Sequence, residues 1–109
     1  MSAITLSDAI ALTKTYRDNK DGILEPKVNP DVLPICETLD RADFDALLAQ
    51  KDCQKIRIYL GMTEKLDIRI IAVGVNSDDE DILPTGDELI MENGARCPYV
   101  CPPPSVLNS

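Results

Sequence analysis

The chain has 109 residues, of which 44% are hydrophobic and 28% are charged, and its formal net charge is -8 at pH 7. These values fit one globular domain with a modest core and do not fit general disorder. The acidic balance disfavours nucleic acid and anionic membranes as partners, and the absence of histidine excludes Ser-His-Asp and Cys-His catalysis by this chain alone.

The first element predicted along the chain is an amphipathic helix that begins near Leu6. Apolar side chains recur at helical spacing from Leu6 through Ile10 to Tyr16, and Thr5 or Ser7 is the expected N-terminal cap. The segment lacks the basic start, unbroken apolar run and cleavage site of a signal peptide, and no stretch of the sequence reaches membrane-spanning length. We therefore expect a cytoplasmic protein that does not enter a membrane.

A Pro-rich connector at residues 25–34 precedes a predicted short strand at 35–39 and a second helix. Asp40 is the expected N-cap of this helix. The buried stripe of the helix is expected to comprise Phe44, Leu47 and Leu48.

The strongest strand signal lies in residues 55–60 and 66–75, where apolar and polar residues alternate. The short segment between them starts with glycine and predicts an antiparallel hairpin. A three-residue loop sets Arg57 opposite Asp67 and a five-residue loop sets it opposite Arg69; opposite charges favour the first register. One hairpin face is expected to pack under the helices, and the other to present Arg57, Tyr59 and Arg69.

The acidic stretch 76–81 predicts a solvated turn, with weak binding of divalent ions left open. An EF-hand loop is excluded, because the positions that need Gly and Glu hold Asp81 and Asp87. Residues 87–92 are the predicted last strand.

This order of elements predicts an α+β fold: two helices packed on a small, mainly antiparallel sheet, with an extended Pro-rich C-terminal tail. We expect a single domain over residues 1–94 and a Cys/Pro-rich tail over 95–109.

The four cysteines leave several chemistries open. Structural zinc sites usually join two close pairs, and Cys97 with Cys101 is the single close pair in the sequence. A thioredoxin-like pair needs a following helix, which the prolines after Cys101 forbid. A Cys97–Cys101 disulfide under oxidation would close only a small loop. In a reducing cytosol, thiols that are buried or anchor the tail are the default expectation.

The tail from Gly94 to Ser109 is expected to fold back as an extended strap, with Cys97 and Cys101 turned toward Cys53 or the apolar strand end at 71–75. Its prolines lower the entropy cost of such ordering. The apolar residues that would provide the cover are Tyr99, Val100, Val106 and Leu107. The alternative is a free tail whose prolines dock in the groove of a partner.

The segment LLAQ-x-x-C-x-x-IRIY-x-G at residues 47–61 and the C-P-x-x-C tail at 97–101 resemble a family of short bacterial proteins. The likeness extends to the first helix end at 16–19, where Tyr16 stands in a position that the family usually fills with Phe. The resemblance implies a bacterial origin and a shared fold, and it brings no assigned activity. It also implies that Cys53 belongs with Cys97 and Cys101.

No phosphate-binding, dinucleotide-binding or metalloprotease motif occurs in the sequence. We therefore expect a non-enzymatic interaction module without a cofactor, whose partner is another protein, a second copy included. Its predicted contact residues are Arg57, Tyr59, Arg69, Tyr99, Pro102, Pro103 and Pro104. The alternative is a zinc-binding or thiol-redox module that uses Cys53, Cys97 and Cys101, with Cys36 as a further ligand. The acidic charge leaves a cationic partner or a divalent metal ion open.

Overall fold

A computed structural model describes residues 2–84, 90–92 and 94–109 of the chain. Its elements are α1 (Leu6–Asn19), the 3-10 helix η1 (Pro30–Val32), β1 (Cys36–Thr38), α2 (Arg41–Leu48), β2 (Lys55–Met62), β3 (Ile68–Val75), β4 (Ile90–Met91) and β5 (Ala95–Cys97). The strands form two antiparallel sheets: a two-stranded ribbon of β1 and β5, and a three-stranded sheet in the order β2-β3-β4. The predicted α+β class is confirmed. Of the predicted last strand, Ile90–Met91 forms β4, and residues 87–89 lie outside the described residues.

The two helices begin where the sequence predicts. The Thr5 hydroxyl accepts a hydrogen bond of 3.0 Å from the Asp8 N–H and so caps α1. Asp40 occupies the N-cap of α2, but its side chain makes no capping hydrogen bond. The Asp40 backbone carbonyl instead accepts a hydrogen bond of 3.1 Å from the Asp43 N–H. Side-chain capping is therefore confirmed for the first helix only.

The hairpin of β2 and β3 has a different register from the predicted one. Arg57 lies opposite Val73, and Gly61 lies opposite Arg69. Both predicted registers are wrong, because β2 does not turn at Gly61 but continues through Met62. The chain reverses over residues 63–67, where Leu66 has a positive φ of 70° and the Thr63 N–H donates to the Asp67 carbonyl.

The core lies where α2 packs on the middle of the three-stranded sheet. Leu47 of α2 is fully buried, and Ala72 of β3, which lies beside it, is 1% exposed. Val75 of β3 is also 1% exposed, but its side chain points to the other face of the sheet. A shallow hollow remains between α2 and the sheet, and its lining includes Leu39, Phe44, Leu47, Ala72 and Met91. This hollow has no room for a water-sized sphere, so it is a packing gap and not a ligand pocket.

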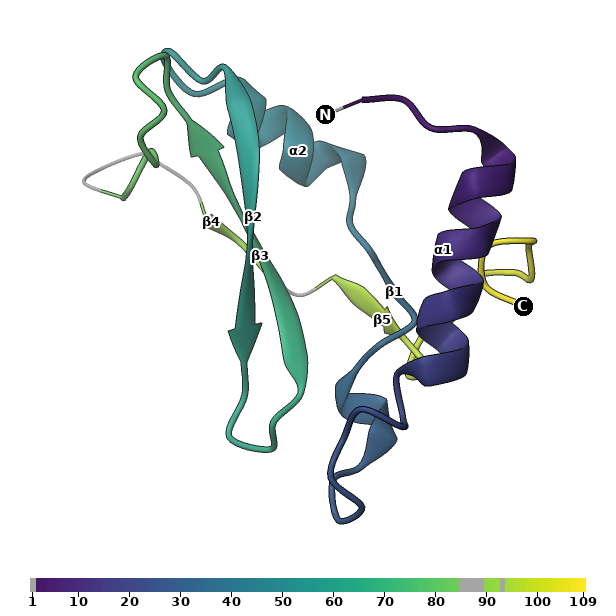
Figure 1. Cartoon of the computed structure of the whole chain (residues 1–109). Helices are drawn as coiled ribbons and strands as arrows, with labels where there is room; N and C mark the ends of the chain where they lie inside the picture. The colour runs from purple at the N-terminus through teal and green to yellow at the C-terminus, as the bar shows by residue number, and fades with distance from the viewer. Residues whose placement is uncertain (1, 85–89, 93) are drawn as a thin grey trace.

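Helix α1 stands apart from this core. Figure 1 shows α1 beside the β1–β5 ribbon and the C-terminus, while α2 accompanies the hairpin on the other side of the molecule. None of the residues of α1 is buried. Its Tyr16 hydroxyl donates a hydrogen bond of 2.7 Å to the Pro34 carbonyl next to the ribbon. The radius of gyration is 16.0 Å, whereas a compact chain of this length has about 13 Å. The molecule is therefore open in shape.

Candidate functional site

The predicted polar face of the hairpin is occupied by the chain's own acidic turn. Arg57 contacts Asp81 at 2.6 Å and Asp79 at 2.9 Å, and the Tyr59 hydroxyl donates a hydrogen bond to Asp81. The antiparallel bridge between Val75 and Asp81 brings the turn back along the sheet. The hydrogen bond to Asp81 raises the pKa of Tyr59 above its usual value. The cluster is held by charge-assisted bonds within the chain.

The remaining polar side chains of this face are also paired. Arg69 lies 3.2 Å from Glu92, and Lys55 lies 3.6 Å from Asp79. These contacts engage Arg69, as the turn engages Arg57 and Tyr59, so a partner would have to compete with them. The role of these residues in binding stays a prediction.

The opposite face of the hairpin exposes apolar side chains. Ile58, Leu60 and Met62 of β2 are 46%, 76% and 60% exposed. They share this face with Ala72, because Ile58 lies directly opposite it and side chains alternate along a strand. Helix α2 covers the Ala72 end and leaves the residues nearer the hairpin loop uncovered. We call Ile58, Leu60 and Met62 the apolar strip.

The apolar strip belongs to an edge strand. Strand β2 stands at the end of its sheet with β3 on one side. The sequence shows the alternation that defines the strip, but it predicts burial for these residues. That expectation assumed that α1 covers the hairpin, whereas α1 lies against the ribbon.

Of the chemistries that the sequence left open for the cysteines, the structure contains the Cys97–Cys101 disulfide. Cys97 and Cys101 form a disulfide with a Cα–Cα distance of 4.4 Å, while Cys36 and Cys53 are free thiols. The default expectation of thiols is therefore wrong for Cys97 and Cys101. Cys36, which the resemblance left out, lies directly opposite Cys97 across the ribbon. Cys53 instead lies beside Gly74 of β3, where its sulfur would contact an added Cβ.

Within the described part of the chain, no group of three or more Cys, Asp or Glu side chains is arranged to hold a metal ion. A disulfide sulfur is not the thiolate that zinc requires, so Cys97 and Cys101 do not fit zinc in this oxidised form. Zinc binding by the reduced chain stays a prediction.

The tail folds back onto the ribbon and not onto the apolar strand end. Its first residues form β5, which lies within the predicted tail and pairs with β1 of the predicted domain. The tail's apolar side chains remain exposed, so the predicted cover of residues 71–75 is wrong; these side chains are Tyr99, Val100, Val106 and Leu107. The Arg17 guanidinium of α1 donates to the carbonyls of Leu107 and Ser109 and holds the end of the chain.

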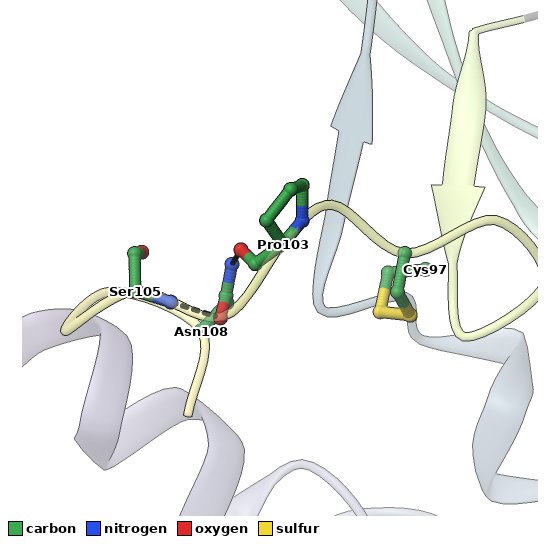
Figure 2. The surroundings of a disulfide bond; sticks show 5 residues. Cys97, Pro103, Ser105 and Asn108 are labelled. Carbon is green, nitrogen blue, oxygen red and sulfur yellow. Dashed lines mark hydrogen bonds between the residues drawn. A yellow bond between two sulfur atoms is a disulfide. The ribbon is translucent and has the colours of Figure 1, made fainter.

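The Pro-rich part of the tail is shaped by local polar contacts. Figure 2 shows the disulfide and the turn that follows, in which the Ser105 N–H donates to the Asn108 side chain at 2.9 Å. The Asn108 amide donates in turn to the Pro103 carbonyl at 3.2 Å. Of the predicted contact residues, Pro102 is half-buried, whereas Pro103 and Pro104 are exposed.

Arg96 is a buried charge that the sequence did not single out. Its Nε atom and one terminal nitrogen make no hydrogen bond within the described residues, and Glu37 lies directly opposite it with an equally unpaired Oε1. The guanidinium carbon lies 5.5 Å from the centre of the Tyr99 ring, which is within cation–π range. Tyr99, a predicted contact residue, is thus partly engaged inside the chain.

The chain matches no protein family model, no curated protein and no solved structure. The resemblance to short bacterial proteins therefore stays a prediction. Over residues 2–84, 90–92 and 94–109, no helix has the length and apolar character to cross a bilayer. The cytoplasmic location likewise stays a prediction.

Proposed function

We propose that this chain is a small protein-interaction module that pairs with a second copy of itself along β2. One observation carries the proposal: the apolar strip lies exposed on the edge strand of the sheet. An edge strand offers N–H and C=O groups to another strand, and flanking apolar side chains add contact area. The two features occur together over residues 58–62.

The edge lacks the usual protection against such pairing. Natural edge strands are commonly guarded by charges, prolines or bulges. The charged residues of β2, Lys55 and Arg57, both lie near its start, and Arg57 is engaged by the acidic turn. Residues 58–62 contain neither charge nor proline. This half of β2 therefore favours strand addition.

The strand is also compatible with itself. In an antiparallel pair, directly opposite residues point to the same face, so a two-fold axis centred on one residue keeps like faces together. Centring on Tyr59 sets Ile58 opposite Leu60 of the second copy. It also sets Arg57 opposite Gly61 of the second copy, so no two cations meet. The apolar strips of the two copies then lie side by side on one face.

The exposed area is sufficient for an interface of this kind. The accessible surface of the chain is 7869 Å², whereas a compact monomer of the same mass exposes about 6,000 Å². The excess of about 1,900 Å² is more than twice the roughly 800 Å² that each partner contributes to a standard interface. A second copy can therefore cover part of this surface and leave the rest exposed.

The proposal is tested by measuring the molar mass of the full chain by sedimentation equilibrium. The wild-type chain should approach twice 12.0 kDa as its concentration rises. Leu60→Lys should remain monomeric, because it places a charge in the middle of the apolar strip. Ile23→Lys is the matched control: Ile23 is 74% exposed and lies outside the sheet, so this variant should still form dimers.

A wild-type chain that stays monomeric up to near-millimolar concentration would overturn the proposal. Dimers that persist in Leu60→Lys would do the same, because they would place the interface elsewhere. Neither variant changes a buried side chain, so both should keep the far-ultraviolet circular dichroism of the wild-type chain.

A further inference from the structure

The β1–β5 ribbon brings a free thiol to a disulfide. Cys36 of β1 lies directly opposite Cys97 of β5, and the Ile35 N–H donates to the Cys97 carbonyl at 3.0 Å. The Cα atoms of directly opposite residues in an antiparallel pair lie about 4.5–5.5 Å apart. That separation falls inside the roughly 4.4–6.8 Å that a disulfide spans. Cys97 therefore has a second potential partner besides Cys101.

The exposure of the three cysteines differs in a way that suits exchange. Cys97 is 5% exposed, Cys36 is half-buried and Cys101 is exposed. The buried Cys97 is shielded from thiols in solution, while Cys36 approaches it from within the ribbon. Access of the attacking thiol is one of the factors that set the rate of exchange.

We propose that Cys36, Cys97 and Cys101 form a thiol–disulfide exchange site in which Cys97 is the shared sulfur. The Cys36 thiol loses its proton, and its thiolate attacks the Sγ atom of Cys97. The Cys36–Cys97 bond forms as the Cys97–Cys101 bond breaks, and the electron pair leaves on Cys101, which takes up a proton. The step is an isomerisation that needs no external oxidant or reductant.

The two disulfides constrain the chain differently. The Cys97–Cys101 bond closes a short loop inside the tail, whereas a Cys36–Cys97 bond joins the two strands of the ribbon. Exchange therefore opens the loop over residues 97–101, links β5 covalently to β1 and leaves an exposed thiol on Cys101. The segment that follows Cys97 is then held by the contacts of Arg17 with the carbonyls of Leu107 and Ser109. A partner that carries an accessible disulfide can react with the released Cys101 thiol, forming a mixed disulfide and releasing one partner thiol.

The experiment maps disulfides in the oxidised full chain by mass spectrometry. The chain is incubated at about pH 8, near the usual thiol pKa, and samples are quenched in acid over time and alkylated. We expect the wild-type chain to contain both the Cys97–Cys101 and the Cys36–Cys97 linkage, with the free thiol moving between Cys36 and Cys101. Cys36→Ser should retain the Cys97–Cys101 linkage alone, and Cys53→Ser should behave as the wild type does.

A second variant tests the same pairing without the competing bond. In Cys101→Ser, oxidised glutathione should accept two electrons, yield two glutathione thiols and leave a Cys36–Cys97 disulfide. A wild-type chain that shows one linkage at all times would overturn the proposal. So would disulfides that include Cys53 as often as Cys36 in native buffer, since those would indicate unselective exchange.

Discussion

Asp81 is the shared hydrogen-bond acceptor of the polar face of the hairpin. It accepts hydrogen bonds from Tyr59 and from Arg57. Both bonds lower the pKa of Asp81, and the bond from Tyr59 has the larger effect. The bonds to Asp81 therefore stabilise the folded chain fully above pH 3.8, the ordinary pKa of an Asp side chain, and this stabilisation is lost as the pH falls. The bond between Tyr59 and Asp81 also raises the pKa of Tyr59. Its contribution to stability is therefore present below pH 10.0, the ordinary pKa of tyrosine, and is lost as the pH rises.

The substitution Asp81→Asn should lower the pKa of Tyr59. The hydrogen bond to the ionised Asp81 carboxylate is the largest cause of the raised pKa of Tyr59, and an amide removes that negative charge. Tyrosinate absorbance against pH, corrected with the Tyr59→Phe variant, measures this titration. Asp78→Asn is the control, because Asp78 belongs to the same turn but makes no contact with Tyr59 among the described interactions. An unchanged Tyr59 titration in Asp81→Asn would contradict the described cluster.

At the scale of elements, the sequence predicts the helices and strands that are determined by interactions between residues close in the chain. Helical spacing and the Thr5 cap place α1, and alternation places β2 and β3. The hairpin register is not predictable in the same way, because Gly61 has the composition of a turn but continues the strand. The reversal instead uses Leu66 at positive φ, a conformation that nothing in the residue type announces.

The candidate surfaces depend on long-range docking, which the sequence patterns do not encode. Alternation identifies Arg57 and Tyr59 as one face, but their engagement by Asp81 depends on the path of a later turn. Likewise, the sequence predicts that Leu60 is buried, whereas it is exposed because α1 does not cover the hairpin. The approach of Cys36 to Cys97 follows from the pairing of two strands that are far apart in the sequence, and β5 carries too few residues to show a pattern.

The packing of α2 on the sheet makes Leu47 the most sensitive position of the helix. Leu47 is fully buried and Leu48, its neighbour, is half exposed. Leu47→Ala should therefore reduce the free energy of unfolding by about 2–5 kcal/mol, because it opens a cavity against Ala72. Leu48→Ala should cost less than about 1 kcal/mol. Urea unfolding at one fixed protein concentration compares the two, and equal costs would show that α2 is not docked through Leu47.

At the scale of the whole molecule, the open shape and the net charge both affect how two copies of the chain can associate. The chain divides into a side with the hairpin and α2 and a side with α1 and the ribbon (Figure 1), and its radius of gyration of 16.0 Å reflects that division. Two chains of net charge -8 repel each other at long range. Strand β2 itself contains no acidic residue, so the proposed pairing sets no carboxylate of one β2 strand against the other.

Amide hydrogen exchange across β2 tests the proposed pairing most directly. The peptide that covers residues 55–62 should exchange more slowly at near-millimolar than at micromolar chain concentration, because pairing with a second copy protects the amides that face away from β3. Helix α1 should show no such dependence, and Leu60→Lys should abolish the dependence in β2. If the exchange of residues 55–62 is the same at both concentrations, a second copy does not bind along this edge.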